Sequence, residues 1–137
     1  MAYLVSGSNN GTNVNDFWRY NPADGKWTEL RKITNVSDDD YDDEYSDIIR
    51  NNAVGFVLGN KAYLTVGLNG GYTSKTWEYD FASDTWTRKT PFERSAREGA
   101  VAFAVKGKAF VATGLNSSFY WDDLEEFLPL IDKDSDD

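Results

Sequence analysis

The 137-residue sequence contains no cysteine and no histidine. Without cysteine the chain forms no disulfide and offers no thiol nucleophile. Without histidine, catalytic arrangements such as Ser-His-Asp are excluded, and so are metal sites with imidazole ligands. Carboxylate chemistry remains available, but no two carboxylates stand out as partners for acid–base catalysis. We therefore expect a chain that is not an enzyme and holds no cofactor.

Long apolar runs are missing as well. No stretch of 18 or more apolar residues occurs, so we expect no membrane span. The opening residues, MAYLVSGSNNG, lack the basic and apolar regions of a signal peptide. Because the sequence begins directly on a strand-like run, we expect that a segment has been removed upstream.

Basic residues are scarce relative to acidic ones. The chain has 14 Lys and Arg against 23 Asp and Glu, a formal net charge of −9. Residues 38–47 and the last six residues, DKDSDD, carry this excess, and the remainder is near neutral. Nucleic-acid binding requires a basic stripe along the phosphates, and none is visible. We expect no nucleic-acid partner.

Aromatic residues, in contrast, are abundant and occur in a repeated phrase. The phrase NDFWRYNPADGKW occupies 15–27 and SKTWEYDFASDTW occupies 74–86, each with two tryptophans nine residues apart. A third, weaker copy, DLEEFLP, begins at Asp123. Self-similarity at a fixed period is typical of repeat architectures.

A second phrase precedes the first in every copy. It reads AYLVSG at 2–7, AYLTVG at 62–67 and AFVATG at 109–114. Before the last two copies stand RNNAVGFVLGNK and REGAVAFAVKGK, which begin 47 residues apart at Arg50 and Arg97. Alternating apolar and β-branched runs bounded by Gly, Asn, Asp and Pro indicate four short strands per repeat. An all-β fold follows.

These phrases resemble kelch repeats, in which four-stranded blades form a β-propeller. The most specific elements are the glycine that ends the second strand, the aromatic residue of the third and the tryptophan of the fourth. The resemblance implies that the Trp and Tyr side chains fill the wedge between neighbouring blades. One departure is the glycine pair that usually ends the second strand, of which only the second member is kept. The pairs here are Ser6-Gly7, Val66-Gly67 and Thr113-Gly114.

Within the family, the sequence looks most like kelch proteins of Bacteroidetes, which are often envelope lipoproteins. That likeness rests on the stretch from Tyr41 to Leu64 and on DDLEEF near an acidic end. It implies an extracytoplasmic location, in the periplasm or cell envelope. Copper oxidases that use kelch propellers need His ligands and a Cys-linked Tyr. Their activity is not carried over, because this chain has neither residue.

The fold class predicted is therefore all-β, a kelch-type β-propeller segment of about two and a half to three four-stranded blades. Propellers typically close with four to eight blades. We expect either a piece of a longer propeller or a homo-oligomer that completes the ring. The predicted divisions are a partial blade at 1–30 without its first strand, an acidic inter-blade insertion at 31–49, a complete blade at 50–90, a partial blade at 91–127 and an acidic tail at 128–137.

The loops that follow the second strands are the first candidate binding surface. Because neighbouring strands alternate in direction, these loops share a face of a propeller with the inter-blade loops. Their amide and aromatic side chains suit a protein surface or sugar stacking, although solvated turns would have the same composition. The partner-binding candidates are Asn9, Asn10, Asn69, Tyr72, Asn116, Tyr120 and Trp121.

The acidic insertion is the second candidate. It has three interpretations: a solvated loop, a calcium site or a docking surface for a basic partner. Oxygen ligands in a flexible loop suit calcium, but the residue order of an EF-hand is absent. The candidate metal ligands are Asp38, Asp39, Asp40, Asp42, Asp43 and Glu44.

These observations favour a non-catalytic binding or scaffolding module that contacts a protein or another surface through its loop face. The alternative is a calcium-dependent protein that binds or processes glycans and whose active part lies in missing blades. The identity of a protein or glycan partner is not encoded in any motif that we recognise.

Overall fold

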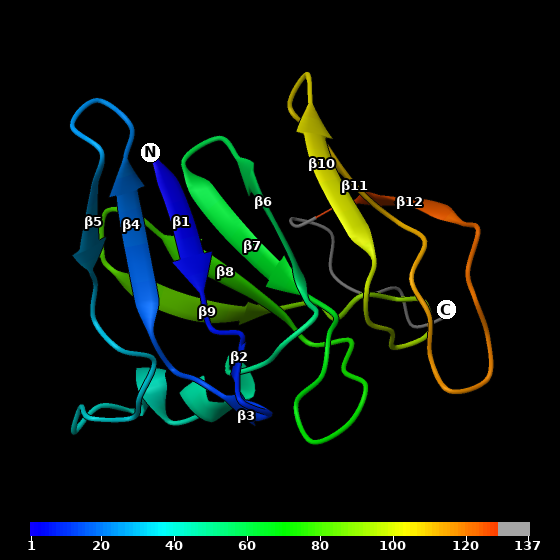
Figure 1. Cartoon of the computed structure of the whole chain (residues 1–137), viewed down its shortest axis with the longest axis horizontal. Coiled ribbons are helices and arrows are strands. Elements are labelled where there is room, and N and C mark those ends of the chain that lie inside the picture. Colours follow the sequence, from blue (N-terminus) through cyan, green and yellow to red (C-terminus); the bar gives the residue numbers. More distant parts are fainter. Residues whose placement is uncertain (129–137) are drawn as a thin grey trace. The chain divides into compact units, whose positions relative to one another are not determined.

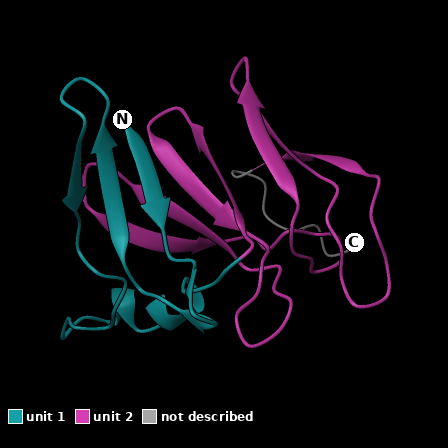
Figure 2. Cartoon of the chain, viewed as in Figure 1, with its two compact units in different colours: residues 1–51 teal, residues 52–137 magenta. Residues whose placement is uncertain are grey.

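The computed structural model describes residues 1–128, so the predicted acidic tail lies outside the described residues apart from Leu128 (Figure 1). The chain divides into two compact units, residues 1–51 and residues 52–137 (Figure 2). Each unit is built from small antiparallel sheets whose strands are arranged in the order in which they occur in the chain.

The first unit contains a three-stranded sheet of order β1-β4-β5. The pairing places Tyr20 directly opposite Trp27, on the same face of the sheet. A short hairpin, β2–β3, turns through Asn10 and Gly11, both with positive φ, as an Asn-Gly hairpin turn requires. The strands are β1 (Ala2–Val5), β2 (Ser8–Asn9), β3 (Thr12–Asn13), β4 (Phe17–Asn21) and β5 (Lys26–Glu29).

The acidic insertion completes the first unit and forms two short 3₁₀ turns, η1 (Asp40–Asp42) and η2 (Tyr45–Asp47). Its end is held to the sheet by Ser6. The Ser6 Oγ accepts a hydrogen bond from the Arg50 N–H at 2.8 Å and lies 2.9 Å from the Arg50 carbonyl oxygen. Because this link is buried, it fixes where the insertion rejoins the sheet.

The second unit contains a four-stranded sheet, β6-β7-β8-β9, and a three-stranded sheet, β10-β11-β12. Tyr79 lies opposite Trp86 in the first of these, as Tyr20 lies opposite Trp27 in the first unit. The strands are β6 (Val54–Leu58), β7 (Lys61–Thr65), β8 (Thr76–Asp80), β9 (Thr85–Lys89), β10 (Val101–Val105), β11 (Lys108–Ala112) and β12 (Leu124–Phe127).

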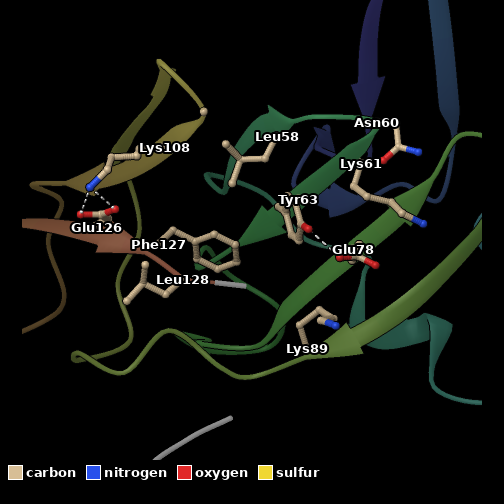
Figure 3. Close-up of a pocket in the computed structure, with 11 residues that line it drawn as sticks. Leu58, Asn60, Lys61, Tyr63, Glu78, Lys89, Lys108, Glu126, Phe127 and Leu128 are labelled. Atoms are coloured by element: carbon tan, nitrogen blue, oxygen red, sulfur yellow. Dashed lines mark hydrogen bonds and ion pairs between the residues drawn. The ribbon is translucent and has the colours of Figure 1, made fainter. Parts of the chain in front are cut away.

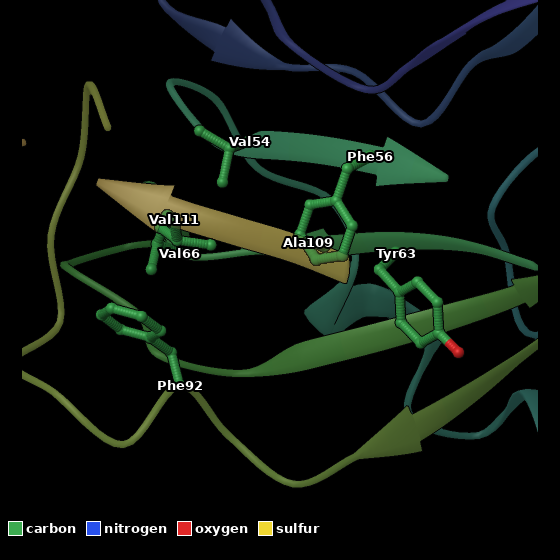
Figure 4. Close-up of a cluster of buried hydrophobic side chains, with 7 residues drawn as sticks. All are labelled: Val54, Phe56, Tyr63, Val66, Phe92, Ala109 and Val111. Carbon is green, nitrogen blue, oxygen red and sulfur yellow. The ribbon is translucent and has the colours of Figure 1, made fainter. Parts of the chain in front are cut away.

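The core of the second unit lies between its two sheets (Figure 4). Alternate residues of a strand point to one face, so Val54 and Phe56 of β6 lie on the same side as Tyr63 of β7. Phe127 of β12 packs against this face, with ring centroids 5.0 Å from Phe56 and 5.1 Å from Tyr63. The buried members are Val54, Phe56, Tyr63, Val66, Phe92, Ala109 and Val111.

The all-β prediction is confirmed. Sheets of three, four and three strands appear in chain order, which is the arrangement expected of successive propeller blades. In the described part of the chain, helical structure is confined to the two 3₁₀ turns. No helix there is long and apolar enough to span a membrane.

The residue before each strand-ending glycine adopts a left-handed conformation. Ser6, Val66 and Thr113 have φ of 53°, 53° and 60°. Such values are rare for any L-residue and unfavourable for a β-branched one such as Val or Thr. Glycine would adopt the same conformation without strain, as at the first position of the glycine pair in the repeats that the sequence resembles. In this chain Ser6, Val66 and Thr113 adopt the left-handed conformation without being glycine.

Candidate interaction surface

The loop that follows β11, residues 115–121, carries the most exposed aromatic side chains of the described chain. Tyr120 is 88% exposed and Phe119 is 60% exposed. Large apolar side chains are normally covered, so two adjacent exposed rings are an unusual feature of this loop. We call residues 115–121 the aromatic loop.

Asn116 fixes the backbone of the aromatic loop. Its side-chain oxygen accepts hydrogen bonds from the N–H groups of Ser118 at 3.0 Å and Phe119 at 3.1 Å. Its own N–H donates to the Phe119 carbonyl oxygen at 3.0 Å. This Asx-type turn holds the loop in one conformation, so the exposed rings project from a backbone that is already ordered.

Trp121 packs against Phe119 of the aromatic loop. Its ring lies 5.5 Å from that of Phe119, and the guanidinium of Arg97 lies 4.8 Å from its centroid. The backbone N–H of Trp121 donates to the Gly114 carbonyl oxygen at 2.9 Å. Of the partner-binding candidates in this loop, Trp121 is partly buried and Tyr120 is exposed, as is Phe119, which was not among the candidates.

Arg97, which lies against the Trp121 ring, is fully buried. Its guanidinium forms a two-pronged ion pair with Asp123, at 2.6 and 2.9 Å, and also lies 4.9 Å from the Phe92 ring. The hydrogen bond and charge of Arg97 hold the pKa of the Asp123 carboxyl below its ordinary value. A bidentate pair of this kind fixes direction as well as charge.

The corresponding loop after β7, residues 68–73, lies on the same side of the second unit (Figure 1). Asn69 N–H donates to the Gly71 carbonyl oxygen at 2.9 Å, and Leu68 and Tyr72 form an isolated antiparallel bridge. Asn69 is exposed and Tyr72 is partly exposed. Within the second unit, the structure therefore brings Asn69 and Tyr72 to the same side as Asn116 and Tyr120.

In the first unit, Asn9 and Asn10 are exposed at the tip of the β2–β3 hairpin. The neighbouring Asn13 accepts a hydrogen bond from the Asn51 side chain at 2.6 Å, so its amide is used structurally. The positive φ of Asn10 accounts for its presence in the turn without a binding role.

The acidic insertion separates its carboxylates. Asp42 is fully buried, and one of its oxygens accepts hydrogen bonds from the N–H groups of Val36 and Ser37, both at 3.1 Å. Asp43 accepts one from the Asn35 side chain at 2.9 Å. Among residues 1–128, no three acidic side chains are grouped so that they could hold a metal ion. The exposed remainder are Asp38, Asp39, Asp40 and Glu44.

Comparison with known proteins was made on the whole chain. Residues 3–33 match the family model of the kelch motif. No curated protein matches the chain. The matched kelch motif contains β1, β4 and β5 and ends at buried Ile33, whose N–H donates to the Asn15 carbonyl oxygen. The motif supports the kelch-repeat family and the propeller-segment fold predicted from the repeats.

Proposed function

We propose that the chain is a non-catalytic protein-binding module whose principal contact is the aromatic loop. The observation that carries this proposal is the 88% exposure of Tyr120 beside exposed Phe119, on a backbone fixed by Asn116. Kelch motifs generally mediate protein–protein interaction, and residues 3–33 are such a motif.

The proposal rests on the surface area that the two aromatic side chains can bury and on the little conformational entropy that they lose on binding. Tyr and Phe bury a large area with few rotatable bonds, so they lose little conformational entropy on binding. An ordered loop removes a further cost, because the backbone does not have to be immobilised by the partner. Binding energy at protein interfaces is concentrated in a few such aromatic anchors. Tyr120 and Phe119 meet these conditions better than the polar Asn9 and Asn10.

The location that we propose is the cell envelope. It is supported by the resemblance of the stretch 41–64 to kelch proteins of Bacteroidetes. In this proposal the aromatic loop contacts another envelope protein, and no reaction is catalysed.

The experiment that tests the proposal is site-specific photocrosslinking in the cells that make the protein. A benzophenone amino acid replaces Tyr120 in one variant and Tyr41, an exposed tyrosine of the acidic insertion, in the matched control. We expect one crosslinked protein from position 120 and not from position 41. The crosslinked protein is identified by mass spectrometry and purified.

Affinity measurements with that partner complete the test. Tyr120→Ala should weaken binding by about 10-fold to 100-fold, because truncation of an anchor costs roughly 1–3 kcal/mol. Tyr41→Ala should leave the affinity within about twofold. Equal affinity of Tyr120→Ala and the parent would refute the proposal. Binding of a purified glycan that Tyr120→Ala abolishes would assign the same surface to sugars instead.

A further inference from the structure

A cavity of about 560 Å³ lies in the second unit (Figure 3). It lies at the opposite ends of β7 and β11 from the aromatic loop. It is bordered by the β6–β7 turn, the β10–β11 turn and the end of β12. Lys61 and Lys108, which begin β7 and β11, line it, whereas the loops 68–73 and 115–121 follow the ends of those strands. The cavity is therefore a separate site, and we call it the interblade cavity.

The wall of the interblade cavity is largely apolar. Leu58 of β6 and Leu128, which follows β12, line it together with the rings of Tyr63 and Phe127. These rings are 5.1 Å apart, and both belong to the packing between the two sheets. A volume of 300–1,000 Å³ with apolar walls and a few polar groups is typical of small-ligand sites.

Charged side chains surround this apolar wall, and most of them already have partners. Lys108 forms an ion pair with Glu126 at 2.9 Å, and Lys61 forms one with Asp80. Glu78 accepts a hydrogen bond of 2.6 Å from the Tyr63 hydroxyl (Figure 3). Burial, reinforced by Glu78, raises the pKa of Tyr63, so its hydroxyl stays protonated and remains the donor.

Lys89, the last residue of β9, is the exception. It lines the cavity and is partly buried, but forms no ion pair with another described residue. Three ammonium groups and two carboxylates line the cavity, in a protein whose net charge is −9. Lys89 is therefore the ammonium group of the lining that has no ionic partner among the described residues, while Glu78, bonded to the neutral Tyr63 hydroxyl, keeps its negative charge.

We propose that the interblade cavity binds a carboxylate attached to an aromatic or branched apolar group. The carboxylate pairs with Lys89, and the apolar group packs against Phe127, Leu58 and Leu128. A free apolar acid and the C-terminal residue of a peptide share this chemistry. The site is independent of the proposed protein-binding role of the aromatic loop.

The test is a titration of the whole isotope-labelled chain, followed by backbone amide NMR shifts. The probes are 3-phenylpropionate and N-acetyl-Gly-Phe as free acid, each beside its carboxamide. We expect saturable shifts at Leu58, Gly107 and Leu128, with the acids binding at least about tenfold more tightly than their amides. Tighter binding of the peptide acid would indicate a peptide terminus, and tighter binding of 3-phenylpropionate would indicate a free acid.

Two lysine variants test whether Lys89 is the residue that binds the carboxylate. Lys89→Met should reduce the affinity for the acids to that of the amides and leave amide binding unchanged. Lys26→Met, at an exposed lysine of the first unit, should change neither. Thermal unfolding confirms that each variant is folded, and Lys89→Gln replaces Lys89→Met if the latter is not. Equal binding of acid and amide by the parent, no saturable binding, or undiminished acid binding by the Lys89 variant would overturn the proposal.

Discussion

The first and second repeats place the same ring pair in different surroundings. Tyr20 and Trp27 have ring centroids 5.0 Å apart at 40°, and Tyr79 and Trp86 have them 5.0 Å apart at 43°. Yet Trp27 is 53% exposed and Trp86 is 6% exposed. The repeat therefore encodes the geometry within the sheet, whereas burial of the tryptophan depends on what lies beyond it.

On the other face of the sheets, equivalent residues of successive repeats also differ in burial. Val54 and Phe56 of β6 are buried in the core of the second unit, while their equivalents in β10, Val101 and Phe103, are exposed. Blades that are apolar on both faces require a neighbour on each side. The homo-oligomer predicted from the repeat count would supply such neighbours, and it stays a prediction.

The largest contrast should come from truncating the two tryptophans. We expect Trp86→Ala to lower the free energy of unfolding by about 3–5 kcal/mol, because the side chain is buried. Trp27→Ala should lower it by about 1 kcal/mol, chiefly through the lost contact with Tyr20. Urea unfolding followed by circular dichroism measures both. Equal losses would contradict the difference in burial, and a loss that grows with protein concentration would show that a second copy covers Trp27.

The strand-ending glycines provide the next contrast. Gly7 and Gly114 both have positive φ, 117° and 100°, so alanine is strained at either position. A Cβ at Gly114 would also lie 2.9 Å from the Glu98 carbonyl oxygen, whereas at Gly7 nothing lies within 4 Å. We expect Gly114→Ala to cost about 3 kcal/mol and Gly7→Ala about 1 kcal/mol. Matching urea midpoints for the two variants would rule out the backbone clash as the cause.

A third contrast concerns how stability depends on pH. The third repeat pairs Arg97 with Asp123, whereas the second repeat has Lys75 at the position of Asp123. The next residue in the second repeat, Thr76, has its hydroxyl 2.7 Å from that of Thr65, and this pair carries no charge. The lowered pKa of Asp123 means that its contribution is present above the unfolded pKa of about 4 and is lost as pH falls through the folded value.

We therefore expect Asp123→Asn to cost about 2 kcal/mol at pH 7. The difference from the parent should shrink as pH is lowered below about 4, because the parent then loses the charge as well. Melting temperatures at pH 7, 5 and 3 measure this, with Thr76→Val as a control whose effect should not vary with pH. A constant difference for Asp123→Asn would contradict the ionic origin.

The smallest effect should be a gain. Thr113 is exposed and has φ of 60°, a conformation that costs a β-branched residue about 1–2 kcal/mol. Glycine removes this strain but has more freedom in the unfolded chain, which costs roughly 0.5–1 kcal/mol. Thr113→Gly should therefore stabilise the protein by about 0.5–1 kcal/mol in urea unfolding. Val66→Gly, the matched change in the second repeat, should destabilise because the Val66 side chain is buried in the core.

The strands could be predicted from the sequence because each repeat alternates apolar and polar residues over short distances. Tyr120 could be named as a binding candidate because it lies in the loop between the second and third strands. The exposure of Phe119 was missed, because a phenylalanine is normally counted as core. The only local signal was Asn116, which can form an Asx turn, but such a turn does not reveal which ring it exposes.

In the acidic insertion, the sequence did not predict which carboxylate is buried. In a run of seven carboxylates, no residue is marked as the one that turns inward. Asp42 is buried where the N–H groups of Val36 and Ser37 converge on it. Burial of a charged group depends on such hydrogen-bond partners in the folded loop and not on local composition.

The order in which strands pair also has a kinetic consequence. Each sheet joins strands in chain order, with only the short β2–β3 hairpin between β1 and β4, so pairing in a growing chain can begin before later repeats have been synthesised. The first unit also contains a longer-range link, the buried bond between Ser6 and Arg50, which closes a separation of 44 residues. Its closure must wait until the whole acidic insertion has left the ribosome. We expect it to be the last step in folding of the first unit, and the step that lengthening the insertion would slow.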